Sequence, residues 1–246
     1  MPVVDALKIR RFVVEELTWE SASVYTLRLS PQTSEDQVTF TAGQWVYWHL
    51  LNPDGTSWGR AAFSFASSPK ELEGSIQLAI KIEKDFTKKG GSLQPGDVVG
   101  VQGPFGVFVL PKELPSSLVL FAGGIGIAPL RSMIRELHLT NAAVPITLFY
   151  SNRYIEDAVY FEEFQELAKS WPLLTFVPTL TGEDNPSIWK GELGRLSRAM
   201  IQKYVPDLQK PLYYMCGPDS FMDAIQGIMA EAGVDTKKQL KKELFG

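Results

Sequence analysis

Cysteine is almost absent from this chain of 246 residues. The single cysteine, Cys216, cannot form an internal disulfide, and it cannot supply the thiolates of an iron–sulfur cluster or a cysteine-rich zinc site. The two histidines, His49 and His138, add little capacity to bind a metal. We therefore expect no metal centre, and any redox chemistry requires a bound organic cofactor.

Long apolar runs and an excess of positive charge are also missing. No run reaches the roughly 18 apolar residues of a membrane helix, and Met1 to Glu20 lacks the basic and apolar regions of a signal peptide. The 24 basic and 28 acidic residues give a net charge of -4, which supplies no long-range attraction to a phosphate backbone. We expect a cytoplasmic protein with no membrane span and no nucleic acid partner.

The chain does contain two stretches of different texture. The first carries short β-rich runs separated by turns, which is typical of a sandwich or closed barrel. From about Ser117, apolar strands alternate with segments of helical periodicity, and this pattern predicts a parallel sheet with right-handed crossovers. The expected fold is an antiparallel β-barrel over residues 1–112 followed by an α/β domain over residues 113–246. The strands expected in the barrel are 10–17, 23–30, 45–51, 63–67, 75–82 and 97–102.

A glycine-rich loop follows the first strand of the α/β domain. Its sequence is Gly123-Gly124-Ile125-Gly126-Ile127-Ala128-Pro129, and an amphipathic segment comes next. Such a strand-to-helix turn lets backbone N–H groups and the helix terminus approach a pyrophosphate, and proline fits the first helical turn. The loop departs from the usual dinucleotide fingerprint by ending in proline, and glycine-rich turns also arise for purely structural reasons. Both interpretations stay open from the loop alone.

Two further positions bear on nucleotide binding. The second strand is followed by Ser151-Asn152-Arg153, without the acidic residue that the fingerprint expects. Arg153 is a candidate contact for an adenine or a 2′-phosphate, and the alternative is a solvated side chain. Cys216-Gly217-Pro218 ends the last strand, where a nicotinamide lies if the glycine loop holds the pyrophosphate. The alternative for Cys216 is a buried small residue.

A series of short motifs runs along nearly the whole chain. In order they are Ala42-Gly43-Gln44, Phe63-Ser64-x-Ala66-Ser67-Ser68-Pro69, Leu93-x-Pro95-Gly96-Asp97, Gly103-Pro104-x-Gly106, Gly124-x-Gly126-x-x-Pro129, Trp189-x-Gly191-x-x-Gly194 and Cys216-Gly217-Pro218. Each motif is weak alone, but in this order the set resembles the ferredoxin–NADP reductase superfamily, in which an FAD barrel precedes an NAD(P) domain.

The resemblance implies roles in the barrel. Phe63, where the family usually has tyrosine, packs on one face of the isoalloxazine, and Ser64 hydrogen-bonds near flavin N5. Ile80 and Lys81 line the next flavin segment, and Thr87 caps the turn that meets the FAD pyrophosphate.

The resemblance also implies roles in the second domain and the tail. Cys216 stands beside nicotinamide C4, and Cys216 and Glu243 position that ring. Gly217 and Pro218 complete the nucleotide site. Phe245 is a candidate lid on the other flavin face, and the alternative for this tail is an edge strand.

Two departures affect the expected FAD phosphate contacts. In the family one residue separates the phosphate-binding arginine from the aromatic, whereas Ala61 and Ala62 separate Arg60 from Phe63. In a strand this offset turns Arg60 to the opposite face, so the contact needs a β-bulge at the two alanines or another cation. The second departure is Lys84-Asp85-Phe86 before Thr87, where relatives usually have a glycine.

The predicted function is a flavoprotein reductase that moves a hydride from NAD(P)H to bound FAD and passes electrons to a separate acceptor. The acceptor classes are a ferredoxin-like protein, a haem protein, an oxygenase component or a small molecule. Lys81, Lys84, Lys88 and Lys89 are candidates for a basic rim facing an acidic acceptor, against the alternative of a solvated face softened by Glu83 and Asp85.

Two other functions stay open, a reductase of free flavin and a subunit that works only within a larger complex. The choice between NADH and NADPH is open as well. Thr179-Leu180-Thr181 lacks the arginine of NADP-specific relatives, which favours NADH, while Arg153 favours NADPH.

Overall fold

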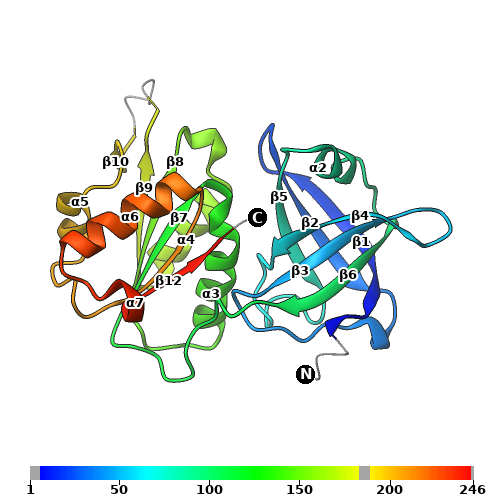
Figure 1. Cartoon of the computed structure of the whole chain (residues 1–246), viewed down its shortest axis with the longest axis horizontal. Helices are drawn as coiled ribbons and strands as arrows, with labels where there is room; N and C mark the ends of the chain where they lie inside the picture. The colour runs from blue at the N-terminus through cyan, green and yellow to red at the C-terminus, as the bar shows by residue number, and fades with distance from the viewer. Residues whose placement is uncertain (1–5, 183–188, 245–246) are drawn as a thin grey trace. The chain divides into compact units, whose positions relative to one another are not determined.

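The computed structural model describes residues 6–182 and 189–244. The chain forms two compact units, drawn in Figure 1 and treated separately below. The first contains the chain up to Leu110 together with Arg131–Thr140, and the second contains Pro111–Leu130 and the chain from Asn141 onward. Within the described ranges, no helix is both long enough and apolar enough to cross a membrane.

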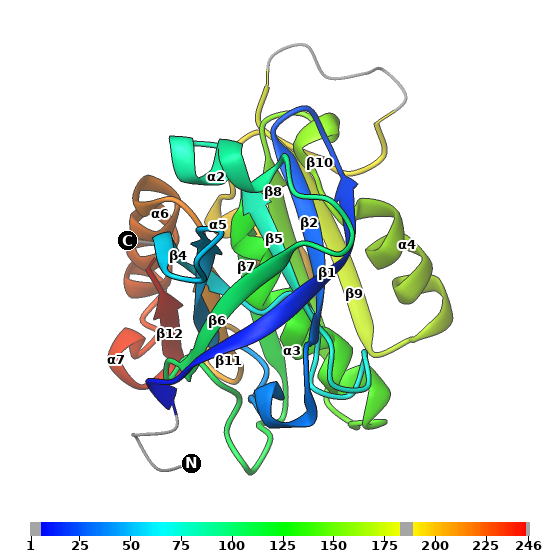
Figure 2. The same ribbon diagram turned by 90° about the vertical axis from the view of Figure 1, so that its right-hand side faces the viewer.

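The first unit is built on an antiparallel sheet whose strand order is β4-β3-β6-β1-β2-β5. A bridge between Phe65 and Leu78 joins the segment after β4 to β5, and Figure 2 shows how the strands curl round. Apolar residues of alternate strand positions fill the interior, with Phe12, Tyr25, Val46 and Trp48 fully buried. The elements are β1 (Ile9–Trp19), β2 (Val24–Pro31), η1 (Ser34–Asp36), β3 (Trp45–Leu51), β4 (Ser57–Ser64), β5 (Ile76–Lys81), α2 (Asp85–Gly90) and β6 (Val98–Phe105).

The short helix α2 packs against the barrel interior. The Thr87 hydroxyl accepts hydrogen bonds from the backbone N–H groups of Glu83 and Lys84 at 3.0 and 3.1 Å, so it caps the first turn. The Tyr25 hydroxyl donates to the Thr87 carbonyl at 2.7 Å. Gly90 allows the close approach of α2 to the core, because a Cβ there would lie 2.2 Å from the Trp48 ring.

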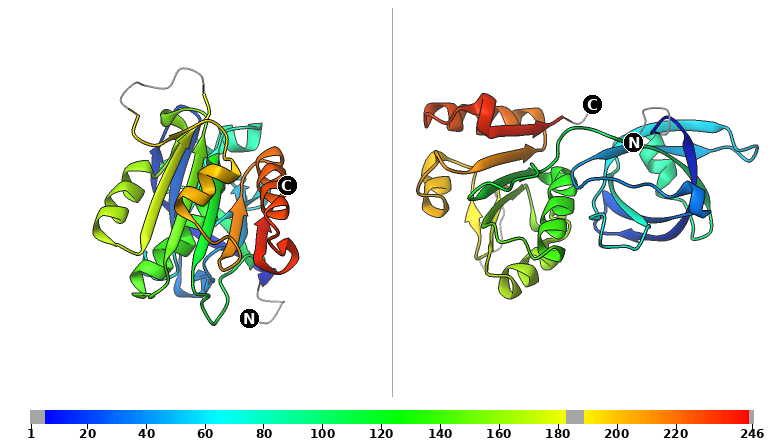
Figure 3. Two further views of the ribbon diagram at one scale, coloured as in Figure 1. Left: turned by 90° about the vertical axis from the view of Figure 1, so that its left-hand side faces the viewer. Right: turned by 90° about the horizontal axis from the view of Figure 1, so that it is seen from below.

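The second unit is a parallel sheet with the order β10-β9-β8-β7-β11-β12. The side chains of β7 alternate, and Val119 and Phe121 pack with residues of α5 and α6 on one face. Helix α4 packs on β9 from the other face through Phe161 and Phe164, whose rings lie 5.7 and 5.6 Å from that of Phe176. Figure 3 shows the orange and red helices on one side of the strands and the yellow-green α4 on the other.

The strands of the second unit are β7 (Leu118–Gly123), β8 (Ile146–Asn152), β9 (Leu174–Leu180), β10 (Glu192–Leu193), β11 (Leu212–Cys216) and β12 (Leu240–Glu243). The helical elements from Gly124 onward are η2 (Gly124–Gly126), α3 (Ile127–Leu139), η3 (Ile155–Asp157), α4 (Phe161–Ser170), α5 (Arg198–Tyr204), α6 (Asp219–Glu231) and α7 (Thr236–Gln239).

The predicted architecture is confirmed, an antiparallel sheet in the N-terminal part and a parallel sheet with helices after it. One predicted strand, 63–67, is wrong. Strand β4 runs from Ser57 to Ser64 and pairs with β3, whereas the segment from Phe65 to Ser68 leaves β3 and crosses toward β5. The alternation of Phe63 and Phe65 continues past the end of the strand, and the sequence pattern does not mark that end.

Candidate functional site

The parallel sheet changes direction of growth between β7 and β11. From β7 the chain adds β8 and β9 on one side, and it adds β11 and β12 on the other (Figure 1). In open α/β sheets the crevice at such a switch point, beyond the carboxyl ends of the strands, is where ligands bind. The loop Gly123–Pro129 leaves β7 at this edge, and Cys216-Gly217-Pro218 leaves β11 beside it.

The two loops pack backbone against backbone. A Cβ on Gly126 would lie 2.1 Å from the Cys216 carbonyl oxygen, and a Cβ on Gly217 would lie 3.0 Å from Gly123 Cα. Gly124 has φ +53°, in the left-handed region, and no heavy atom comes within 4 Å of the position its Cβ would take. Pro129 occupies the first turn of α3. The glycines therefore allow both the loop packing and a ligand's close approach.

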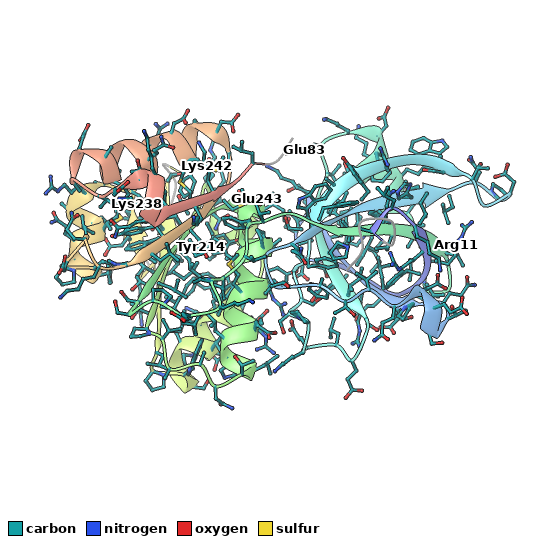
Figure 4. All side chains as sticks on the ribbon, turned by 60° about the horizontal axis from the view of Figure 1, so that its bottom comes forward. Arg11, Glu83, Tyr214, Lys238, Lys242 and Glu243 are labelled. Atoms are coloured by element: carbon teal, nitrogen blue, oxygen red, sulfur yellow. The ribbon has the colours of Figure 1, made fainter. Side chains whose placement is uncertain are left out.

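Cys216 and Glu243 are neighbours in this sheet. They are paired residues of β11 and β12, and Cys216 also pairs with Ala122 of β7. Figure 4 labels Glu243 on β12, next to Tyr214 on β11. Cys216 is fully buried, and burial, with the nearby Glu243 carboxylate, raises the pKa of its thiol well above the ordinary value. Burial also raises the pKa of Glu243. The thiol is therefore uncharged at neutral pH.

The carboxyl ends of β8 and β9 form the other part of this edge. Arg153 directly follows β8, is exposed, and lies with its guanidinium 5.3 Å from the centre of the Tyr154 ring. Its carbonyl accepts a hydrogen bond from Gly182 at 2.8 Å, which ties the two strand ends together. Thr179 is fully buried near the end of β9, and its hydroxyl lacks a hydrogen-bond partner within the described part of the chain.

In the barrel, the register of β4 decides how the predicted flavin residues point. His49 pairs with Arg60, Tyr47 with Ala62 and Val46 with Phe63, without a shift at the two alanines. The bulge that would bring Arg60 to the Phe63 face is therefore not there, and the irregularity in this ladder falls between the pairs Leu50–Gly59 and Leu51–Ser57. Arg60 and Ser64 share one face of β4, and Phe63 lies on the other, against the core.

Arg60 is held by partners on its own face. Its guanidinium lies 4.3 Å from the centre of the Tyr47 ring and donates to Gln102 Oε1 at 2.9 Å. His49 Nε2 lies 3.3 Å from the same amide oxygen, and Gln102 donates to the Leu7 carbonyl at 2.8 Å. Arg60 thus belongs to a polar layer on β3, β4 and β6.

Phe63 belongs to an aromatic group with α2. Its ring lies 5.6 Å from Trp48 and 6.4 Å from Phe86, and Phe86 in turn stacks at 6.4 Å on Trp58. Phe63 is half-buried, so part of its ring is open to a ligand. Phe86, in the stretch where the family usually has a glycine, also approaches Gly59, and a Cβ there would lie 3.5 Å from the Phe86 ring.

The remaining predicted flavin residues differ in exposure. Ser64 is buried, and among the described residues its hydroxyl finds no hydrogen-bond partner. Ile80 is fully buried in the barrel core, so only its backbone remains for a ligand, while Lys81 at the end of β5 is exposed. Phe245 lies outside the described residues. The tail before it forms the edge strand β12.

Sequence reasoning missed several residues that shape these regions. Tyr47 and Gln102 hold Arg60, but neither lies in a recognisable motif. Glu71 and Arg131 form a buried ion pair at 2.8 Å, which separation by 60 positions hides from any sequence pattern. Phe86 lies in one of the two departures from the family pattern, and the aromatic residues Trp48, Trp58 and Phe63 were the available signal for its packing.

Two family models match the chain in succession. Residues 11–110 match an oxidoreductase FAD-binding domain, and residues 120–227 match an oxidoreductase NAD-binding domain. The chain belongs to the ferredoxin–NADP reductase superfamily. It is accordingly an FAD- and NAD-binding oxidoreductase.

Relatives of this superfamily member include a component of the Na(+)-translocating NADH-quinone reductase, named as one of its subunits. The protein from Klebsiella pneumoniae subsp. pneumoniae is 32% identical over 206 residues, which cover 75% of this chain and 49% of the relative. Its counterpart from Marinomonas sp. is 31% identical over 205 residues, covering 75% and 48%. The chain thus spans about half the length of these curated relatives.

Solved structures share the fold at lower identity. The flavohemoglobin of Malassezia yamatoensis with bound FAD and heme superposes with a TM-score of 0.83 at 22% identity, over 97% of this chain and 60% of that one. The ferredoxin NADP+ reductase of Neisseria gonorrhoeae with bound FAD and NADP gives 0.78 at 18% identity, over 96% and 98%.

The residues present fit FAD in part. The unpartnered Ser64 hydroxyl and the half-open Phe63 ring suit a flavin, and the capped turn at Thr87 is formed. Arg60 does not fit a diphosphate contact on the Phe63 side.

Proposed function

We propose that this chain is a flavoprotein reductase that takes a hydride from NADH or NADPH onto bound FAD and delivers electrons to a separate acceptor. The observation that carries the proposal is the crevice between β7 and β11, where the glycine loop meets Cys216 and Glu243 in a chain with FAD- and NAD-binding domains. We assign the flavin to residues 1–112 and the nucleotide to residues 113–246.

On the nucleotide side, backbone N–H groups of Gly123, Gly124 and Gly126 and the start of α3 bind the pyrophosphate, with Pro129 fixing the first turn. Gly217 and Pro218 form the opposite wall of the crevice, and Arg153 contacts the adenosine end. Cys216 and Glu243 position the nicotinamide. The buried, uncharged thiol is a packing surface for that ring and takes no part as a nucleophile.

On the flavin side, the Phe63 ring packs on the isoalloxazine, and Ser64 donates a hydrogen bond near N5. When bound, FAD supplies the chemistry, because it accepts two electrons as a hydride and releases them to its acceptor. The backbone of Ile80 and the side chain of Lys81 line the ring edge, the Thr87 turn meets the pyrophosphate, and Phe245 covers the second face.

The diphosphate charge calls for a cation other than Arg60, and we assign it to Lys84 or Lys88. Both are exposed and flank Thr87, and neither has an ion pair with a described residue. Replacing Lys84 or Lys88 by alanine should weaken FAD binding by roughly tenfold at low salt and less at high salt, as measured by fluorescence titration.

The acceptor is a separate molecule, and a ferredoxin-like protein, a haem protein and an oxygenase component are the proposed classes. The rim of Lys81, Lys84, Lys88 and Lys89 on the β5–α2 segment favours an acidic one. Lys89 lies 4.0 Å above the ring of Trp58, whose side chain is 45% exposed and adds an apolar contact beside this charge. Reduction of an acidic acceptor should slow as ionic strength rises, and a rate independent of salt would contradict the rim.

A second function is favoured by the relatives, which are named as subunits of a larger reductase and are about twice as long. In that case the chain transfers electrons only within an assembly. The cytoplasmic location predicted from the sequence stays a prediction.

One preparation separates these functions. The isolated chain should retain FAD through gel filtration and reduce ferricyanide with NADH or NADPH, and both Michaelis constants decide the nucleotide. Loss of FAD on the column favours the free-flavin alternative, and bound FAD that neither nucleotide reduces favours the role within an assembly. Ser64→Ala should slow flavin reduction in stopped-flow measurements about tenfold or more while FAD stays bound. Unchanged reduction would remove the role of Ser64.

A further inference from the structure

The segment that follows Ser64 is held by a buried polar cluster within the first unit. Arg131, near the start of the Arg131–Thr140 part of this unit, donates from Nη1 to the Ala66 carbonyl at 2.7 Å. The next residue, Ser132, donates to the Ser67 carbonyl at 2.7 Å. Ala66, Ser67 and Ser132 are fully buried.

Glu71 is the centre of this cluster. Its carboxylate accepts from Arg131 Nη2 at 2.8 Å and Nη1 at 3.1 Å, from Arg135 Nε at 3.2 Å and from the Ser68 backbone at 3.0 Å. The Glu71 side chain is only 11% exposed and that of Arg131 7%. A bidentate pair of this kind fixes orientation as well as distance.

Side-chain and backbone partners together satisfy the main chain just beyond Ser64. The Phe65 and Ala66 N–H groups donate to the carbonyls of Gln44 and Gln77 at 3.0 and 2.8 Å. The Ala66 and Ser67 carbonyls and the Ser68 N–H are taken by the cluster. Because β4 ends at Ser64, this segment is fixed largely by Arg131, Ser132 and Glu71 rather than by a ladder partner.

The Ser64 hydroxyl, in contrast, has no partner among the described residues, so its position depends on the backbone that carries it. We infer that Glu71, Arg131 and Ser132 are positioning residues for the Ser64 hydroxyl: they clamp the backbone two to four residues further on and so set where that hydroxyl meets its ligand. This inference rests on the proposed function, because it deepens the role of Ser64.

A clamp and a mere packing contact differ in two measurements. Arg131→Lys keeps the charge but loses the fork that reaches both Glu71 and Ala66. Hydrogen exchange of the Phe65–Ser68 amides in the FAD-free chain should quicken at least tenfold in this variant, with the β2–β5 amides unchanged. Unchanged exchange in the segment would overturn the clamp. This readout needs neither cofactor nor activity.

The second measurement is a double-mutant cycle on flavin reduction. Arg131→Lys should slow reduction roughly tenfold when Ser64 is present and less than about twofold in the Ser64→Ala background, since the clamp then has nothing to position. Equal slowing in both backgrounds would show a general structural effect and overturn the positioning role. Failure of the parent chain to be reduced by either nucleotide would instead refute the proposed function, and the exchange result would still stand for the clamp.

Two further variants keep the result interpretable. Ser132→Ala removes a single hydrogen bond and is used in the same cycle if Arg131→Lys does not fold. Arg28→Lys is the matched control, because Arg28 pairs with Glu15 at 2.7 Å on the surface of the same unit, with 46% and 34% of the two side chains exposed. It should change neither exchange nor reduction. A slowing by Arg28→Lys equal to that by Arg131→Lys would count against the clamp.

Discussion

The two ligand-binding segments of this chain are built from different materials. The glycine loop after β7 is a backbone structure, in which the absence of side chains lets Gly126 pack on Cys216 and leaves open space at Gly124. The segment after β4 is a side-chain structure, because Arg131, Ser132 and Glu71 hold its carbonyls and N–H groups. The first depends on what residues lack, and the second on charged groups brought together from distant positions.

The difference predicts how each segment fails. A backbone loop is disrupted by adding atoms, and a charged clamp is disrupted by removing or neutralising one member. The predictions below test that contrast in order of the expected effect.

The largest effect is expected at the buried charge of the clamp. Burial alone would raise the pKa of Glu71, but the hydrogen bonds and charge of Arg131, with help from Arg135, hold it below its ordinary value of 4.5. A lowered carboxyl pKa contributes stability that is complete above pH 4.5 and is lost as pH falls through the folded-state pKa. Glu71→Gln should therefore cost about 3 kcal/mol of unfolding free energy at pH 7 and progressively less below pH 4.5.

Urea unfolding of the parent chain and Glu71→Gln between pH 7 and pH 3 measures this difference. Glu15→Gln, at the exposed pair with Arg28, is the control and should cost no more than about 0.5 kcal/mol. A cost for Glu71→Gln that does not change with pH would mean that its charge is not what holds the clamp.

The next effect is expected in the glycine loop. In Gly126→Ala the new Cβ would lie 2.1 Å from a backbone oxygen of Cys216, so β7 and β11 must move apart at the crevice. We expect a loss of about 2 kcal/mol in unfolding free energy and at least about tenfold weaker nucleotide binding. Denaturant unfolding and nucleotide titration of the FAD-loaded chain measure both quantities.

Gly227→Ala is the matched control for that loop. Gly227 lies in α6, and no heavy atom comes within 4 Å of its Cβ position, so alanine should stabilise the chain by up to about 1 kcal/mol through helix propensity. Gly126→Ala that binds nucleotide like the parent chain would show that close packing at the switch point is dispensable.

The same contrast explains what the sequence could predict. The loop Gly123–Pro129 and the position of Cys216 follow from local motifs and from the rule for parallel strands, and the two segments do lie side by side. The face of β4 that Arg60 takes could be stated only conditionally, since it depends on register, and the ladder runs through Ala61 and Ala62 without a bulge. The Glu71–Arg131 pair depends on tertiary packing, which leaves no local pattern.

The smallest effect is expected at Arg60, where the contrast is sharpest. Burial mainly lowers the pKa of His49, the Gln102 hydrogen bond raises it, and the Arg60 charge lowers it further. Arg60→Ala should therefore raise the pKa of His49 toward its ordinary value of 6.5, without fully reaching it because the burial remains. NMR titration can follow this change, with His138 as the internal reference among the two histidines.

The same variant tests where the FAD charge is met. Because Arg60 is bound to Gln102 and stacked on Tyr47, its removal should change FAD affinity less than about threefold, whereas loss of a direct charged contact to a diphosphate costs about tenfold or more. A tenfold loss with no change at His49 would place Arg60 on the cofactor after all. The flavin segment would then have to change register on binding, and its side-chain construction would prove less fixed than the glycine loop.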